Sequence, residues 1–429
     1  MVKNKTKNIC RAKQDMISGL PGHVIDVILS CLPIREAVRT SVLSKKWRNN
    51  WHTLPNLVFD RKCVASQDPS IIESKFFRVV YSVLLHHSGP INMFKIHDFE
   101  FICKNDIDQW ILHLARRSIK ELVLQNYTVE EEDFYEIPWC LFSCQSLHCL
   151  ELTYCLWNKP PRTFKGFKDL KSLNLNVVRV TQNALENLIS GCPLLEELIL
   201  MHIDDLTEFT IHAPNLKFFQ FCGKFESITF DNTFQLATIS IDLVTDLDPE
   251  SNRRRLHGHF SNLRKFFDHR PHIQSLMIHT YFLKYLIAGN VPIKLPTPCI
   301  SLRSLSLFIN FYDLKQILAT LCLLRSSPNL QNLEIFTLNE VHNVSLELGT
   351  YCWEETFLRP DTPLQMRHVT LHWISGIQPE LDFIRFLLLY SPVLEKMMVK
   401  HHRVVRPELM TELIRFKRSS GEVEVIYSL

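Results

Sequence analysis

The chain has 429 residues, of which 46% are hydrophobic, so it can form a folded core and is too long for a single ordinary one. Its formal net charge of +3 gives no electrostatic case for nucleic-acid binding, and its 11 glycines argue against Gly-rich nucleotide loops. The 13 cysteines are odd in number and irregularly spaced, which indicates free thiols in a reducing compartment, the cytoplasm, the nucleus or both.

The first 14 residues are basic and have no apolar segment of the kind that directs secretion, so we expect a disordered tail at 1–14. The lysines of this tail could also serve nuclear import. The longest apolar stretches, such as 383–390, are much shorter than a membrane span. We therefore expect no contact with a membrane.

The segment 15–57 is predicted to form three short helices. Pro21 suits the first position of a helix, and Pro33 ends that helix because the residue before a proline is pushed out of the α region. Apolar residues recur between these prolines on more than one side of the helix, so we expect the first helix to bury most of its circumference. These residues are Val24, Ile25, Ile28, Leu29 and Leu32.

Two further helices complete this module. A second is expected from Arg35 to about Val42, and a third from Ser44, which is a suitable N-cap residue. The third helix would carry Trp47 and Trp51 on one face. Three helices of this length cannot bury much apolar area, so we expect a partner protein to cover part of it. The alternative is that the module is only the N-terminal cap of the larger domain.

Short apolar motifs follow one another through residues 20–51. In order they are Leu20-Pro21, Ile28-Leu29-Ser30, Leu32-Pro33, Ala37-Val38-Arg39-Thr40, Val42-Leu43-Ser44, Trp47-Arg48 and Trp51. This order resembles the F-box of plant F-box proteins that carry leucine-rich repeats and an FBD-type C-terminal region, and the resemblance extends over essentially the whole chain. It implies that the module binds a Skp1-like protein within a cullin-based ubiquitin ligase. The implied contact residues are Leu20, Pro21, Ile28, Leu32, Pro33, Val42, Leu43 and Trp47.

A Leu-x-x-Leu-x-Leu pattern recurs after this module. Clear copies begin at Leu147, Leu170, Leu195, Leu302 and Leu330, and weaker copies at Ile119, Ile273, Met366 and Leu394. Adjacent clear copies are spaced by roughly 23 to 29 residues, which is the spacing of leucine-rich repeats. The alternation predicts a strand with its leucines inward, and the helical spacing at 181–189, 312–324 and 381–390 predicts returning helices. Such α/β units stack because none of them can bury its core alone.

The repeat changes its character in the middle of the chain. Between 206 and 241 the apolar pattern returns roughly every ten residues, which leaves no room for a helix, so we expect tight all-β turns of the solenoid there. Residues 246–272 are polar or mixed and should leave the solenoid. The segments 285–299 and 339–363 contain prolines and are expected to be loops.

Residues 364–429 resemble the FBD region of plant F-box proteins. The residues that carry this resemblance are Leu364, Met366 to Val369, Leu381, Phe383-Ile384, Leu387-Leu388 and Val393 to Met397. The family fold implies final α/β repeats with a cap, and a last strand is expected at Val423 to Tyr427. The predicted organisation is therefore a tail at 1–14, an F-box at 15–57, a leucine-rich-repeat solenoid at 58–363 and an FBD-like region at 364–429.

The cysteines and histidines do not form a recognisable metal site. One group of cysteines is close in sequence but lacks a Cys-x-x-Cys pair, so we expect structural thiols and no metal. Its members are Cys140, Cys144, Cys149 and Cys155. His368 and His372 fall on a predicted strand, where their spacing separates them too far to share one ion.

The charged clusters likewise indicate no cofactor. The acidic run at 130–133 has no recognisable nucleophile, histidine or metal partner beside it. The basic groups Arg253-Arg254-Arg255 and Lys400 to Arg406 could hold a polyphosphate only if they converged, and nothing in the sequence shows that they do. No cofactor and no catalytic residue are predicted.

The predicted fold class is α/β: an N-terminal three-helix F-box followed by a leucine-rich-repeat solenoid, with a curved parallel sheet and mixed helical and tight β returns. The predicted function is that of a non-enzymatic adapter, which binds a Skp1-like protein, a cullin via Skp1, and an unknown target protein. The alternative is an interaction scaffold that does not form an active ligase. Outward strand positions are the candidates for target binding. They are Glu121, Gln125, Asn174, Asn176, Asn332 and Glu334.

Overall fold

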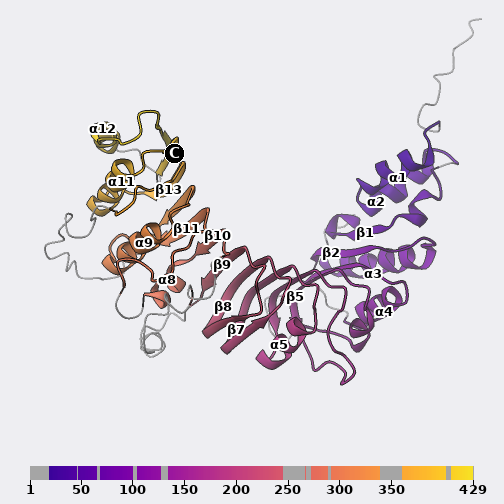
Figure 1. Cartoon of the computed structure of the whole chain (residues 1–429). Helices are drawn as coiled ribbons and strands as arrows, with labels where there is room; N and C mark the ends of the chain where they lie inside the picture. The colour runs from indigo at the N-terminus through magenta and orange to yellow at the C-terminus, as the bar shows by residue number, and fades with distance from the viewer. Residues whose placement is uncertain are drawn as a thin grey trace, which may run out of the picture. The chain divides into compact units, whose positions relative to one another are not determined.

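The computed structural model places most of the chain in two compact units, Met1–Phe167 and Lys168–Leu429, and each unit is described by itself (Figure 1). The structure describes residues 19–45, 47–64, 68–99, 104–126, 134–244, 266, 272–287, 291–338, 360–401 and 407–428. The predicted tail, the acidic run, the Arg253 group and most of the excursions at 246–272 and 339–363 lie outside these residues. The boundary between the two units does not coincide with any predicted domain boundary, so the domain boundaries stay predictions.

The first unit begins with short helices and continues into a parallel sheet. Its helices are α1 (Gly22–Ser30), α2 (Ile34–Arg39), η1 (Thr40–Val42), η2 (Asn50–Thr53), η3 (Arg61–Cys63), α3 (Pro69–His86), α4 (Lys104–Ala115) and η5 (Trp139–Ser143). Its strands are β1 (Asn56–Phe59), β2 (Met93–Phe99), β3 (Glu121–Asn126), β4 (Tyr135–Glu136) and β5 (Cys149–Leu156). Strands β1, β2, β3 and β5 pair in parallel in chain order, and β4 pairs with β5.

The second unit repeats one strand of a parallel sheet many times. Its strands are β6 (Ser172–Arg179), β7 (Glu197–His212), β8 (Phe218–Asp231), β9 (Thr238–Leu243), β10 (Ser275–Ile278), β11 (Ser304–Ile309), β12 (Asn332–Thr337), β13 (His368–Ile374), β14 (Lys396–His401) and β15 (Glu424–Ser428). Each pairs in parallel with the next in chain order. Its helices are α5 (Gln182–Ser190), α8 (Thr280–Leu286), α9 (Leu314–Ser326), α11 (Gln378–Tyr390) and α12 (Pro407–Arg415).

The apolar residues of the repeated pattern form the core, as predicted. None of the three pattern residues in any predicted copy, from Ile119 to Val399, is more than 4% exposed outside the tight region at 206–241. Neighbouring strands place these residues side by side; Leu305, Leu333 and Val369, for example, occupy one register across β11, β12 and β13. The parallel α/β solenoid is therefore confirmed, and its stability comes from burial between successive repeats.

The predicted returning helices are also confirmed. The helices α5, α9 and α11 cover the ranges that the helical spacing predicted, and in Figure 1 α8, α9 and α11 lie along one side of the strands of the second unit. The last strand, β15, agrees with the expected strand at the C-terminus. Residues 291–299 form an irregular loop, as expected, whereas α8 just before it is a helix that the sequence pattern did not predict.

The predicted tight turns between 206 and 241 are wrong in their topology. The apolar copies at Leu206 and Phe225 are the second halves of the long strands β7 and β8, and they pair with each other. The repeat therefore keeps a spacing of about 20 residues here, the lower end of the leucine-rich-repeat range. Helix α5 supports the extension, because Gln182 Oε1 accepts a hydrogen bond from Thr207 N at 2.9 Å.

Strand ends in both units contain the same backbone irregularity. Two residues after the last apolar residue of the pattern, the backbone takes a positive φ of 53° at Tyr154, 51° at Val177, 54° at His202 and 62° at Trp373. At His202 and Trp373 the strand register shifts, which is the signature of a β-bulge. Non-glycine residues rarely adopt this conformation, so its recurrence indicates that the repeat geometry imposes it.

Gly223 occupies the equivalent position on β8, where it pairs with Ile203 just after the bulge of β7. A Cβ atom at Gly223 would lie 2.0 Å from the carbonyl oxygen of Ile203, far inside van der Waals contact. Only glycine therefore lets the two strands approach this closely.

Replacing Gly223 with alanine should lower the free energy of unfolding by about 2 kcal/mol or more, because the clash is with backbone that cannot rotate away. Thermal and urea unfolding followed by circular dichroism would measure this. The matched control is Gly421→Ala, where a new Cβ meets nothing within 4 Å. Equal stability of the two variants would contradict the close approach at Gly223.

Candidate functional site

The N-terminal helices present aliphatic side chains to solvent. The inner side of α1 is buried, with Ile25 and Leu29 fully inaccessible, but the expected burial of most of its circumference is wrong. The exposed fractions are 62% for Val27, 37% for Ile28, 36% for Leu32, 87% for Val42 and 54% for Leu43. These five residues lie on α1, in the turn after it, and at the end of η1; we call them the apolar docking surface.

Most of the predicted docking residues therefore lie where a partner could reach them. Pro21 and Pro33 are exposed, and Leu20 is half-buried. Trp47 differs, because it is 3% exposed and belongs to the core of the module with Ile34. The structure thus places Trp47 in the core of the module and not on the docking surface.

The expected third helix is also wrong. Among the described residues of 44–53, the backbone forms single turns, such as Trp47 N to Ser44 O at 3.2 Å, and the short 3-10 helix η2. The hydroxyl of Ser41 donates to the carbonyl of Arg48 at 3.0 Å and closes this segment on itself. Burial of Trp47 in the core takes precedence over helix propensity here.

One exposed residue, Val27, was not among the predicted contacts. The sequence could have indicated that α1 has exposed aliphatic residues, because a nine-residue helix with this many of them in a small module cannot bury them all. Full burial of one such side chain contributes about 1.5–3 kcal/mol, so a partner that covers the docking surface would gain several times that amount. The arrangement fits protein binding and offers no chemistry of its own.

The candidate target-binding residues face away from the core of the sheet. Glu121 and Gln125 belong to the first unit, and the other four belong to the second. All six are half-buried or exposed, while each has at least one fully or almost fully buried leucine directly next to it along the strand. Glu334 is held by two neighbours, because its carboxylate accepts from Ser306 at 3.2 Å and contacts His372 Nε2 at 2.8 Å.

A row of stacked rings crosses this outward side of the second unit, and the sequence pattern did not reveal it. His279 directly follows β10, and Phe308, Phe336 and His372 lie on β11, β12 and β13. The successive centroid separations are 4.1, 4.4 and 4.3 Å, and the interplanar angles are 13°, 11° and 12°. Trp373 adds a tilted ring 5.4 Å from Phe336. We call these five residues the aromatic ladder.

Three of the four clustered cysteines, Cys140, Cys144 and Cys155, are buried thiols, and Cys149 is half-buried. Burial raises the pKa of both Cys144 and Cys155 to about 12, so neither is a thiolate at neutral pH. Over the described ranges, no group of three or more His, Cys, Asp or Glu residues is placed to hold a metal ion. No helix in the described part of the chain is both long and apolar enough to cross a membrane.

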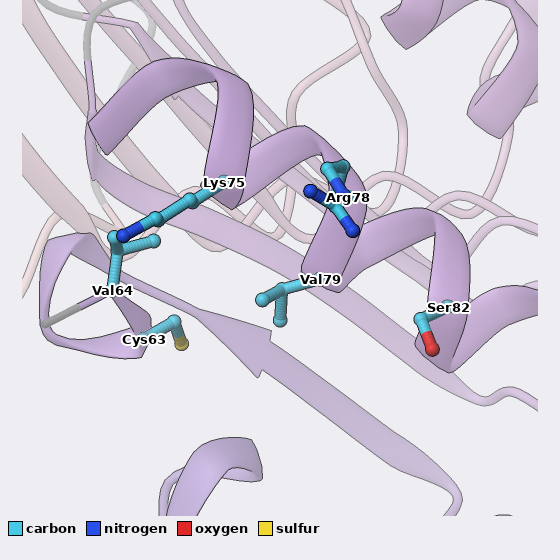
Figure 2. A pocket seen from close by; sticks show the side chains of 6 residues that line it. All are labelled: Cys63, Val64, Lys75, Arg78, Val79 and Ser82. Carbon is cyan, nitrogen blue, oxygen red and sulfur yellow. The ribbon is translucent and has the colours of Figure 1, made fainter. Parts of the chain in front are cut away.

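A pocket of about 410 Å³ lies between the segment after η3 and helix α3. Figure 2 shows Lys75, Arg78, Val79 and Ser82 projecting from α3, with Cys63 and Val64 on the other side. Burial raises the pKa of Cys63 to about 11, which makes its thiol a poor nucleophile at neutral pH. The pocket therefore offers two exposed cations beside a protonated thiol.

The fold and the docking surface together define a repeat protein with an N-terminal helical module for protein binding. Family models agree with this: the F-box domain matches residues 17–59, and "FBD-associated F-box protein At5g56370, LRR repeats" matches residues 107–335. The chain belongs to the F-box/FBD/LRR-repeat family.

Individual relatives support this assignment along the whole chain. F-box/FBD/LRR-repeat protein At1g13570 of Arabidopsis thaliana is 41% identical over 424 residues, which are 96% of this chain and 98% of the relative. FBD-associated F-box protein At4g10400 of the same plant is 27% identical over 427 residues, 96% of this chain and 100% of the relative. F-box/FBD/LRR-repeat protein At3g52680, also of Arabidopsis thaliana, is 36% identical over 48% of this chain and 44% of its own length.

Replacing Trp47 with alanine should loosen the helical module, because removing a buried tryptophan costs about 3–5 kcal/mol. Amide hydrogen exchange across α1 and α2 should become faster. The control is Val42→Ala, which removes an 87% exposed side chain and should leave exchange unchanged. Equal exchange in the two variants would show that Trp47 does not support the module.

The thiols should differ strongly in reactivity. With iodoacetamide at pH 8, exposed Cys31 should be alkylated well before Cys144 and Cys155, which should react only after unfolding because they are buried and have raised pKa values. Site-resolved mass spectrometry over time would measure this order. Labelling of Cys155 as fast as that of Cys31 would contradict the buried-thiol assignment.

Proposed function

We propose that this protein is the substrate-recognition subunit of an SCF-type cullin E3 ubiquitin ligase. In this proposal the F-box binds a Skp1-like protein, which links it to a cullin, and the repeats bind a target protein. The chain itself performs no chemistry. A subunit of this kind works in the cytoplasm or the nucleus, where its free cysteines stay reduced.

The proposal rests on one observation: the N-terminal module has a buried core of its own and still exposes the apolar docking surface. Ile25, Leu29 and Trp47 are buried and fix the fold of the module, while Val42 and Leu43 remain exposed. Exposed aliphatic side chains gathered on a small module are unfavourable in water unless a partner covers them. Membership of an F-box family makes a Skp1-like protein the partner of choice.

The proposed mechanism is proximity. A target held on the repeats would keep its lysines near the ubiquitin-loaded enzyme of the ligase, which raises their effective concentration without any catalytic group on this chain. The target would contact outward strand positions, including Asn174, Asn176 and Asn332 in the second unit. Glu334 is the best defined of the candidates, because its neighbours already orient its carboxylate.

The double substitution Val42→Ala with Leu43→Ala should weaken binding of a purified Skp1-like protein by about 2 kcal/mol or more, roughly thirtyfold in Kd. The same loss is expected for Leu20→Ala with Pro21→Ala. Isothermal titration calorimetry with the full chain would measure both. The control is Leu85→Ala on α3, which removes an 80% exposed leucine outside the F-box and should not change the affinity.

An unchanged affinity of both double variants would show that the docking surface is elsewhere. Adding a cullin to the wild-type complex separates the ligase subunit from a scaffold. The proposal requires that the chain, the Skp1-like protein and the cullin co-elute as one complex. Binding of the Skp1-like protein without the cullin would instead make this chain an interaction scaffold.

A further inference from the structure

The aromatic ladder lies on the side of the sheet that faces away from the core. Phe308 and Phe336 each follow a fully buried aliphatic residue, Leu307 and Ile335, so their rings point to the opposite side. Both are half-buried, and Trp373 is 39% exposed. Stacking between strands stabilises the sheet, but it leaves an apolar surface of ring edges and one indole open to solvent.

The position of Trp373 is fixed by a bulge. Its φ of 62° is a conformation that large side chains rarely adopt. The hydroxyl of Thr337 lies within hydrogen-bond distance of two carbonyl oxygens, 2.9 Å from that of His372 and 2.6 Å from that of Trp373. The indole therefore leans toward β12 and β11, where it lies 5.4 Å from Phe336 and 6.5 Å from Phe308. The same conformation recurs at Tyr154, Val177 and His202, so the repeat geometry imposes it at Trp373 as well.

Acidic residues outnumber basic ones on strands β9 to β13. Strands β9 to β13 contain Asp242 and Glu334 and no lysine or arginine. Asp242 lies 3.5 Å from His279, but burial lowers the pKa of that imidazole, so it is neutral at pH 7 and leaves the carboxylate charge in place. Lys400 is a basic residue on the next strand, β14, so the acidic region does not extend beyond β13. The indole ring of Trp373 lies 5.4 Å from Phe336, on the strand that also carries Glu334.

Glu334 has capacity for a further partner. One of its oxygens contacts His372 and the other accepts from Ser306, which together orient the carboxylate, and its side chain is still 39% exposed. Each carboxylate oxygen can accept a second hydrogen bond. His372 contacts Glu334 at 2.8 Å, and its ring lies 6.3 Å from the indole of Trp373. An oriented carboxylate and an exposed indole that both neighbour His372 suit a guanidinium group, which is planar, stacks on aromatic faces and donates hydrogen bonds at its edge.

We propose that the aromatic ladder, with Glu334, docks an arginine-bearing segment of the target protein. The guanidinium group stacks on Trp373 and donates to Glu334, and apolar neighbours of the arginine lie against the ring edges of Phe308 and Phe336. This inference rests on the proposed function, because it names the chemistry of the target that the repeats recognise.

The test uses the full chain and four display libraries of short peptides, which have random flanks and a fixed central Arg, Lys, Gln or Glu. The Arg library should be enriched about tenfold over the Gln and Glu libraries, and more than the Lys library. Synthetic peptides from the enriched pool should lose about tenfold in affinity with Trp373→Ala and with Glu334→Gln, and less with Trp373→Phe. The control is Trp139→Ala, a 70% exposed tryptophan of the first unit, which should not affect binding.

Two further readouts keep the inference separate from folding and from the proposed function. Lys400→Ala removes the cation on the neighbouring strand and should strengthen binding of the Arg peptides. Each variant should keep the wild-type melting temperature and the affinity for a Skp1-like protein. Enrichment of the Glu library, no preference for Arg, or unchanged binding in Trp373→Ala would overturn the arginine site. Loss of Skp1 binding in the wild-type chain would instead overturn the proposed ligase function.

Discussion

Burial of the inward aliphatic residues between successive parallel strands is the interaction on which the second unit depends. Leu307, Ile335 and Leu371 occupy one register on neighbouring strands, and all three are fully buried. No single repeat could bury its own face, so each strand requires the next. Because the inward side chains hold the sheet together, the outward side chains are not needed for core packing. They can then carry Glu334, the stacked rings and other polar or aromatic groups.

The N-terminal module is stabilised differently. Its own core is small, and the chain leaves it directly through β1, whose Leu57 and Phe59 are fully buried. Phe59 packs against Phe76 of α3 and Phe94 of β2, with centroid separations of 6.4 and 5.5 Å. The strand that follows the module is therefore packed into the first repeats. A rigid support under an exposed apolar surface lowers the entropy cost of binding a partner.

Features that depend on the local sequence pattern could be predicted from the sequence. Features that depend on contacts between distant residues could not. The buried leucines and helices α5, α9 and α11 followed from periodicity, because alternation and helical spacing are local. Trp47 was placed on the surface because a sequence does not show which aromatic residues of a small module lie beneath the others. The aromatic ladder joins residues far apart in the chain, from His279 to His372, and only the strand register reveals it.

In the proposed function, the N-terminal surface and the repeats serve different partners. Amide hydrogen exchange of the full chain, with and without a Skp1-like protein, tests it most directly. The account predicts new protection in α1, the following turn and η1, residues 22–42, and none in the strands of the second unit. Protection that appears only in those strands, or nowhere, would contradict the assignment of the docking surface.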